Sequence, residues 1–221
     1  MNDLKPLFPR SIANLRDLGG LPATQGRVVR SRQLLRSSAL VHLPSATLDN
    51  LTHAVGQATY VDLRTDREID RDGGPTALVA RGWRWHRNPL RDDDLRADGE
   101  CRTAVSRYTA AATAVAEQLE AGPVLVACSL GKDRTGMVIA LLLHWLGVSA
   151  DRVAADYAAS NAHLSAGRHL LPKRWRDEHA EIRPVTAAKC HNVLAAAPAR
   201  PGIVAKVAAE LLAVPPVSVY G

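Results

Sequence analysis

A cysteine, an aspartate and an arginine lie within seven residues and could together cleave a phosphate ester. The segment runs from Cys128 through Asp133 to Arg134. A cysteine thiolate is a nucleophile. A guanidinium can hold two oxygens of a tetrahedral anion in a fork that lysine does not reproduce, and Asp133 is an acid that could protonate a leaving oxygen. These residue types at this spacing predict that Cys128, Asp133 and Arg134 are catalytic.

The flanking residues predict a strand, a polar loop and a helix. Residues 123–127 are a short apolar run that indicates a buried strand, and residues 137–145 are mostly apolar and indicate a buried helix. The unpaired N–H groups and the dipole of a helix N-terminus bind phosphate and favour the thiolate form of Cys128. We therefore expect the loop to hold the anion, with these substrate-binding residues: Ser129, Leu130, Gly131, Lys132 and Thr135.

Length and composition are those of one soluble globular domain. The chain has 221 residues, of which 47% are hydrophobic and 23% charged, so we expect a single domain spanning residues 1–221. No apolar run approaches membrane-spanning length, and the first residues lack the basic and apolar regions of a signal peptide. The sequence therefore predicts a cytoplasmic protein without a membrane span. It indicates no oligomeric state.

Cysteine usage and charge narrow the candidate functions. The three cysteines have no CxxC spacing, which argues against a disulfide framework and a metal site, so we expect neither a metal nor another cofactor. The net charge of +6 would attract a phosphorylated substrate or a nucleic acid equally. The basic residues are scattered and no nucleic-acid-binding motif is present, so the expected partner is a phosphorylated substrate.

Strands and helices alternate along the remaining chain. We expect further strands at residues 58–64 and 83–86, and helices at 102–120, 150–159 and 203–214. Ser45 is the predicted N-cap of a helix over residues 48–55, and Ser149 that of the helix over 150–159. The charged stretch 65–75 is expected to be a loop, residues 91–96 a flap beside the site, and the basic residues 173–176 a solvated face.

Two motifs resemble one protein family. Residues 128–136 read Cys-Ser-Leu-Gly-Lys-Asp-Arg-Thr-Gly and fit the signature of a cysteine, five residues and an arginine that marks the protein-tyrosine phosphatase superfamily. The string resembles the His-Cys-x-x-Gly-Lys-Asp-Arg-Thr-Gly loop of an atypical bacterial and fungal branch. Residues 14–20, Asn-Leu-Arg-Asp-Leu-Gly-Gly, are similar to that branch's Asn-x-Arg-Asp-Leu-Gly-Gly segment.

The resemblance covers about residues 14–161 and implies an α/β fold, with a central, mostly parallel sheet flanked by helices. It implies hydrolysis of phosphotyrosine or phosphoinositides without a metal, and a small phosphorylated metabolite is a further candidate substrate. In this branch the acid within the loop, here Asp133, is implicated as the proton donor. The acids at 92–94 (Asp92, Asp93 and Asp94) remain the alternative. Lys132 is linked to tolerance of multiply phosphorylated substrates.

Supporting roles are expected for three other residues. Arg16 and Asp17 are expected to buttress the phosphate loop. Asp62 ends an apolar strand, where an acid needs a partner. It either pairs locally with Arg64 or faces the loop and holds Lys132 or Arg134. Thr135 is expected to donate a hydrogen bond to the sulfur of the cysteine.

The chief departure from the family pattern is Ala127, which stands where the family usually has histidine. That histidine orders the loop and lowers the thiol pKa, so its absence predicts weaker activation. Three functions follow. The first is an active phosphomonoesterase, and the second is a catalytically weak phosphate-binding module. The third, a sulfurtransferase or arsenate reductase, is disfavoured by the cysteine–arginine spacing and by the lack of evident resolving cysteines.

Overall fold

A five-stranded sheet forms the centre of the protein. The computed structural model describes residues 11–91, 102–197 and 201–215. The strand order is β1-β3-β6-β4-β5, and all neighbours are parallel except β1, which runs antiparallel to β3 at one edge. The expected α/β fold with a mostly parallel sheet is therefore confirmed. The strands are β1 (Arg16–Asp17), β3 (Leu34–Ser38), β6 (Val124–Cys128), β4 (Thr59–Asp62) and β5 (Arg84–Arg87).

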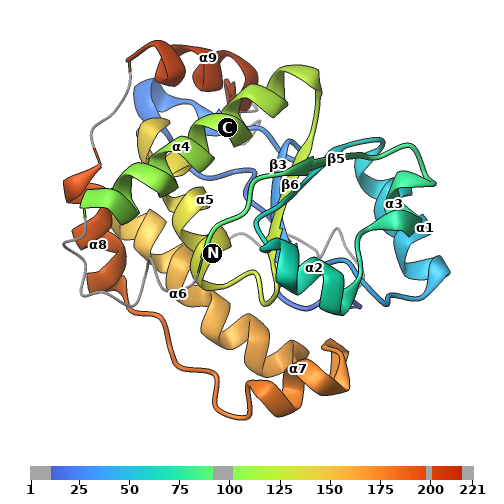
Figure 1. Cartoon of the computed structure of the whole chain (residues 1–221). Helices are drawn as coiled ribbons and strands as arrows, with labels where there is room; N and C mark the ends of the chain where they lie inside the picture. The colour runs from blue at the N-terminus through green and yellow to red at the C-terminus, as the bar shows by residue number, and fades with distance from the viewer. Residues whose placement is uncertain (1–10, 92–101, 198–200, 216–221) are drawn as a thin grey trace, which may run out of the picture.

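Helices cover both faces of this sheet (Figure 1). One face carries the larger group, α4 (Arg102–Gln118), α5 (Asp133–Trp145), α6 (Ala150–Gly167), α8 (Ala187–Ala196) and α9 (Pro201–Leu211). The other face carries α1 (Ser45–Val55) and α3 (Thr76–Val79). Two short helices remain, α2 (Asp66–Asp72) and α7 (Lys173–Glu178), and a separate antiparallel pair joins β2 (Val28–Val29) to β7 (Leu212–Ala213).

The central strand β6 shows how the two faces are separated. Side chains alternate along a strand, and here Val124, Val126 and Cys128 belong to the large core beneath α4 and α5. Leu125 and Ala127 belong to the smaller core beneath α1 and α3. All five residues are buried. The cysteine and the alanine before it therefore face opposite sides of the sheet.

Most predicted elements are present, with shifted ends. The expected strands at 58–64 and 83–86 are β4 and β5, and the helices expected from residues 102 and 150 are α4 and α6. The helix after the loop, α5, begins at Asp133, four positions earlier than predicted. The expected helix at 203–214 is α9, which ends at Leu211 and leads into β7.

Three local predictions are wrong. Residues 65–75 are not a loop, because Thr65 and Glu68 form a capping box that starts α2. Ser45 is the first residue of α1 rather than its N-cap, which is Pro44. Residues 173–176 are more than a solvated face, since Trp175 of α7 is buried in a third apolar cluster.

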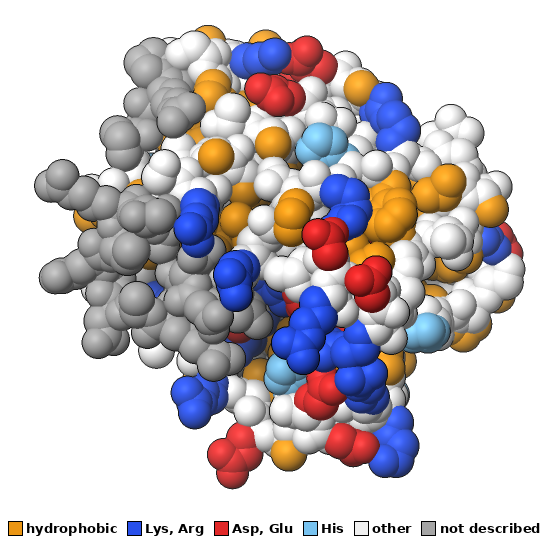
Figure 2. All heavy atoms as spheres, in the orientation of Figure 1, with side chains coloured by type: hydrophobic (Ala, Val, Ile, Leu, Met, Phe, Trp, Pro, Cys, Tyr) orange, Lys and Arg blue, Asp and Glu red, His pale blue; other side chains and the backbone are white. Residues whose placement is uncertain are grey.

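The surface in Figure 2 mixes charges of both signs. On this face, Lys and Arg side chains lie among Asp and Glu side chains, and orange apolar atoms lie between them (Figure 2). Among the described residues, no helix has the length and apolar character needed to cross a membrane.

Candidate active site

Cys128 lies at the end of β6, where the chain turns into α5, and it borders a large cavity. Its side chain is only 3% exposed. The cavity has a volume of about 2000 Å³, and its walls come from α2, the loop after β6, residues 178–186 and α8. Most of the predicted site residues lie in this wall, namely Cys128, Ser129, Leu130, Lys132, Asp133 and Arg134.

The backbone N–H and carbonyl groups of the loop differ in their hydrogen bonding. The N–H groups of residues 129–133 donate to no group among the described residues. The carbonyl groups of the loop, in contrast, are bonded: Ser129 O accepts from Ala39 N at 3.1 Å, and Lys132 O accepts from Gly136 N at 2.9 Å. Buried N–H groups without partners are costly. A row of them beside a helix N-terminus is suited to an anion.

The loop rests closely on strand β3. Gly131 has φ of +65°, and a Cβ there would lie 2.1 Å from the carbonyl oxygen of Ser37. A side chain is therefore excluded by both the left-handed backbone and the contact. Asn14, just before β1, donates its amide N–H groups to Leu130 O at 3.0 Å and to Gly131 O at 2.9 Å.

A buried ionic network continues below the loop, and we call its members the floor: Asn14, Arg16, Arg36, Asp156 and Ser160. Asp156 of α6 pairs with Arg16 at 2.7 Å and with Arg36 at 2.6 Å. Burial opposes ionisation of Asp156, but Arg36 and Arg16 hold its pKa below the usual range. Burial and the charge of Arg36 lower the pKa of Arg16 to about 10, which leaves it protonated at neutral pH.

The opposite side of the loop is held by Glu68 and residues 179–186, which we call the rim. The Glu68 carboxylate accepts from Arg134 Nη1 at 2.8 Å and Nη2 at 2.7 Å, and from Ser129 Oγ at 2.7 Å. Although burial opposes its ionisation, the hydrogen bond and charge of Arg134 hold the pKa of Glu68 well below the usual range. Glu68 therefore orients the guanidinium that is expected to bind the anion.

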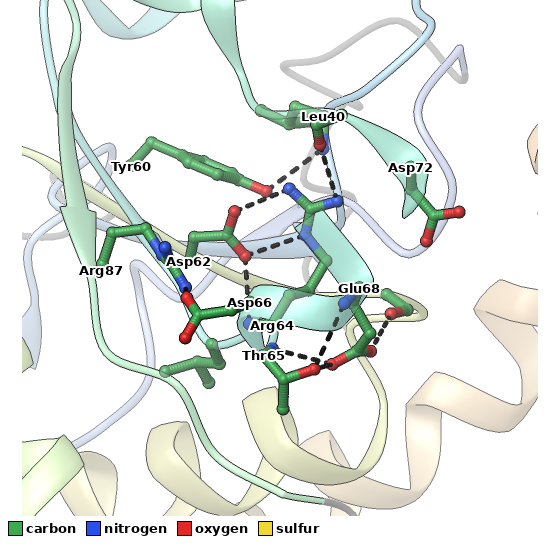
Figure 3. Close-up of polar contacts among 12 residues, drawn as sticks. Leu40, Tyr60, Asp62, Arg64, Thr65, Asp66, Glu68, Asp72 and Arg87 are labelled. Carbon is green, nitrogen blue, oxygen red and sulfur yellow. Dashed lines mark hydrogen bonds and ion pairs between the residues drawn. The ribbon is translucent and has the colours of Figure 1, made fainter. Parts of the chain in front are cut away.

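Asp62 pairs with Arg64, which is the nearer in sequence of its predicted partners. Its carboxylate accepts from Arg64 Nε at 2.9 Å and Nη2 at 2.7 Å. Figure 3 shows this pair below Tyr60, with Glu68 on the adjacent α2 and Thr65 at the N-cap of that helix. Both residues are buried. Of the two alternatives, the local pair with Arg64 is confirmed and the contact with Lys132 or Arg134 is not formed, because both oxygens of Asp62 are engaged with Arg64 and Glu68 is the acid that pairs with Arg134.

Arg16 and Asp17 differ in their relation to the loop. Arg16 Nη1 bonds the side-chain oxygen of Asn14 at 2.5 Å, so it reaches the loop through Asn14. Asp17 instead accepts from the backbone N–H groups of Gly19 and Arg32. Both of its oxygens are thus bonded to the backbone at residues 19 and 32 and not to the loop, which corrects the expectation that Asp17 buttresses the loop. Burial is the main cause of a raised pKa at Asp17.

The remaining loop side chains have distinct surroundings. Lys132 Nζ donates to Arg183 O of the rim at 2.5 Å and pairs with Asp133 at 3.2 Å. Leu130 packs in the third apolar cluster, beside Trp175. The Thr135 hydroxyl is buried without a hydrogen-bond partner among the described residues, so the expected bond to the Cys128 sulfur is not formed.

Several contacts of the loop are not predicted by the sequence. These residues are Asn14, Arg36, Asp156 and Glu68. A signal was present for Glu68, because Thr-x-x-Glu is the pattern of a capping box and places a helix here. Apart from the bonds between Arg16 and Asn14, the contacts of the floor join residues 95 to 144 positions apart, which no local pattern specifies. The alternative acids at 92–94 lie outside the described residues.

Ala127 is fully buried among the residues of the smaller core, which include Leu35, Tyr60 and Leu125. A histidine at this position would place its ring in that apolar cluster. The structure thus gives the departure from the family pattern a physical context, since the space on this side of the sheet is filled by aliphatic and aromatic side chains.

Comparison with known proteins places the chain in a family. A tyrosine phosphatase family model matches residues 9–213. The chain is 30% identical over 171 residues to a Cupriavidus necator protein provisionally described as a tyrosine-protein phosphatase, covering 68% of this chain and 61% of that one. It is 32% identical over 190 residues to the triple specificity protein phosphatase PtpB of Mycobacterium tuberculosis, covering 67% and 66%.

The chain thus spans less than two thirds of the length of these curated relatives. Among solved structures, the core catalytic domain of the PP-IP phosphatase SIW14 from S. cerevisiae is 15% identical with a TM-score of 0.46, covering 76% of this chain and 93% of that one. The family match extends over nearly all of the described residues, and on that basis the chain belongs to the tyrosine phosphatase family.

Proposed function

We propose that this chain hydrolyses phosphate monoesters through a phosphocysteine intermediate on Cys128. One observation carries the proposal: the backbone N–H groups of residues 129–133 have no described partner, and they belong to the loop that follows a cysteine bordering the cavity. Such groups stabilise the equatorial oxygens of a phosphoryl group as charge shifts during transfer. Arg134 adds a fixed positive charge to the same wall.

The reaction has two steps. The Cys128 thiolate attacks phosphorus in line, and a sulfur–phosphorus bond forms. The phosphorus–oxygen bond to the leaving group breaks, and its electron pair goes to the leaving oxygen. We assign Asp133 as the acid that protonates this oxygen. Water, deprotonated by Asp133, then attacks phosphorus. The sulfur–phosphorus bond breaks, and inorganic phosphate and the thiolate are released.

The cavity favours a substrate larger than a single phosphotyrosine side chain. Its volume of about 2000 Å³ exceeds that of most small-molecule sites. Basic side chains of α2, the loop and α8 line it, among them Arg67, Lys132 and Lys189. Phosphotyrosyl protein, phosphoinositide and a small phosphorylated metabolite are the candidate classes. The name of the M. tuberculosis relative, a triple specificity phosphatase, supports a broad range.

The first experiment measures turnover of an aryl phosphate in the presence of a metal chelator. We expect hydrolysis by the unaltered chain, none by Cys128→Ser, and a phosphorylated Cys128 in acid-quenched samples analysed by mass spectrometry. Cys128→Ser should still bind inorganic phosphate, because the N–H groups of the loop remain. Hydrolysis that persists in Cys128→Ser, or that stops when metal is removed, would contradict the mechanism.

A second experiment tests Asp133 as the proton donor. Asp133→Asn should slow hydrolysis of an alkyl phosphate about 100-fold or more but that of an activated aryl phosphate far less, because only the poor leaving group needs the proton. Asp151→Asn, at an exposed position on α6, is the matched control. Equal losses on both substrates would exclude this role for Asp133.

A catalytically weak phosphate-binding module is the second candidate. Two contacts favour it: Arg134 is already paired with Glu68, and Lys132 is already bonded to Arg183. The two candidates differ in one measurement. A module would release no product from aryl phosphate, phosphotyrosyl peptide or phosphoinositide, whereas an enzyme would hydrolyse at least one of them.

A further inference from the structure

We propose that Asn14 and Arg36 are positioning residues that set the anion affinity of the loop by holding its carbonyl groups on the side away from the cavity. The inference rests on the proposed function of the loop as an anion site. It concerns side chains that come from before β1 and from β3, and that reach the loop from below. Neither side chain is in the wall of the cavity.

The argument begins with the geometry of the peptide bond. In a planar trans peptide, the carbonyl of one residue and the N–H of the next point in opposite directions. A donor that holds the carbonyl of Leu130 below the loop therefore turns the N–H of Gly131 upward. In the same way, a donor on the carbonyl of Gly131 turns up the N–H of Lys132. The direction of each N–H is thus controlled from the opposite side of the loop.

Asn14 provides such donors with a fixed orientation. It is 2% exposed, and its amide nitrogen donates to both Leu130 O and Gly131 O. Its oxygen accepts from Arg16, so the two ends of the amide cannot be exchanged. Its backbone has φ of +58°, a left-handed conformation that asparagine adopts more readily than most residues. Side chain and backbone both favour asparagine here.

Arg36 provides the second set of donors to the carbonyl groups of the loop. Its Nη2 donates to Gly131 O at 2.8 Å and approaches Lys132 O at 3.4 Å. The side chain is fully buried and is held by Asp156 at 2.6 Å and by Ser160 at 3.0 Å. A Cβ at Gly136 would lie 2.9 Å from the same nitrogen. The guanidinium therefore lies tightly under the first turn of α5.

These contacts hold the loop in a chain with Ala127. The side chain of Ala127 packs in the smaller core, whereas Asn14 and Arg36 bind the consecutive carbonyls of residues 130–132. The positive charge of Arg36 also lies beneath the proposed anion. Removing either side chain should therefore weaken anion binding even though neither touches the anion.

The test measures the dissociation constant of inorganic phosphate by calorimetric titration of the full chain. Asn14→Asp keeps the size of the side chain but turns an acceptor toward the two carbonyls, and we expect a dissociation constant raised about tenfold or more. Asn14→Gly keeps the left-handed backbone and removes the donors, so a smaller rise is expected. Asn50→Asp, at an exposed position of α1, controls for the change in net charge.

Arg36 is tested by partial rescue. Arg36→Met should raise the phosphate dissociation constant more than Arg36→Lys, because lysine restores the charge and one donor. The ratio of kcat/KM for the variants should follow the ratio of phosphate affinities. A purely structural role would lower the unfolding temperature of both variants without this ordering. If Asn14→Asp does not fold, the comparison of Asn14→Gly with the unaltered chain replaces it.

Folded Asn14 variants that bind phosphate as the unaltered chain does would overturn the inference. So would equal phosphate affinities for Arg36→Met and Arg36→Lys. If the unaltered chain binds phosphate but hydrolyses no ester, the proposed function fails, and the dissociation constants still decide this inference. If the unaltered chain binds no phosphate, both fail.

Discussion

The floor and the rim hold the same loop by different physical means. Floor residues such as Arg36 and Asn14 are 0% and 2% exposed, and they bind backbone carbonyls. In the rim, the side chain of Glu68 is 18% exposed and binds side chains of the loop. A contact to backbone fixes where N–H groups point, whereas a contact to a side chain sets only the position of that group.

The difference indicates a division of roles. The floor is an ionic network in which Asp156 pairs with Arg16 and Arg36, and none of its members is among the described residues that line the cavity. The rim borders the cavity, and its contacts involve Arg134 and Lys132, which are proposed to meet substrate. Changes in the floor should therefore lower stability and anion affinity together, and changes in the rim should act mainly on turnover.

The largest expected effect is at Asp156. Asp156→Ala leaves the buried Arg36 and the partly buried Arg16 without their counter-ion, which should lower the free energy of unfolding by about 3–5 kcal/mol. Urea denaturation measures this loss. Asp177→Ala removes an exposed i,i+4 pair with Lys173 and should lower the free energy of unfolding far less, because such a pair is screened by solvent. Equal effects at the two positions would show that the floor is no more than a surface network.

The ion pairs of Asp156 with Arg16 and Arg36 also predict how the free energy of unfolding depends on pH. The pKa of Asp156 is lower in the folded state than in the unfolded chain. Its contribution is therefore fully present above the unfolded pKa of about 4 and is lost as pH falls through the folded value. The difference in unfolding free energy between the unaltered chain and Asp156→Asn should be constant between pH 5 and 7, by this reasoning, and shrink below about pH 4. A difference that grows toward acid would contradict the pairing.

A smaller loss of stability is expected when Ala127 is replaced by histidine, the residue usual in the family. Ala127→His forces a polar ring into the smaller core, which should lower the free energy of unfolding by about 1–3 kcal/mol and should not activate the thiol. Ala46→His, at an exposed position of α1, is the control. An unchanged stability with a raised kcat/KM would mean that the smaller core can rearrange and that the histidine activates the thiol.

The smallest of these effects concerns the rim. Glu68→Gln keeps one acceptor for Arg134 but removes the charge, and we expect kcat/KM on aryl phosphate to fall about tenfold, corresponding to a loss of about 1.4 kcal/mol. Glu117→Gln, exposed on α4, should change nothing. The opposite result, tighter phosphate binding with kcat unchanged, would mean that Glu68 competes with the substrate for Arg134.

Local sequence signals were sufficient for three strands of the central sheet and for the longer helices. The apolar run before Cys128 and the helix after it are found as β6 and α5. Boundaries were less predictable. The polar residues Asp133 to Gly136 belong to α5, because the first turn of a helix tolerates the polar groups that cap and charge it. The missed helix α2 shows that high charge is no evidence against a helix when a capping box is present.

The site was predictable only in part. The spacing of Cys128, Asp133 and Arg134 gave the loop, because these residues are neighbours in the chain. The partner of Asp62 was open, since a strand-end acid can bond along the chain or across the sheet, and Arg64 lies two positions away with the right reach. Glu68 and Arg36 lie 66 and 95 positions from the loop groups that they bind. Their contacts exist only because the fold brings β3 and α2 next to the loop that follows β6, at the carboxyl ends of the parallel strands.

By itself the sequence determined the candidate loop after Cys128, the strand and helix on either side of it, and the family, since each depends on residue types at short spacing. The tertiary structure alone decided which acid orients Arg134, which side chains hold the carbonyls of the loop, and that Ala127 faces away from it. Those outcomes depend on which faces of distant strands come together, and a linear pattern does not carry that information.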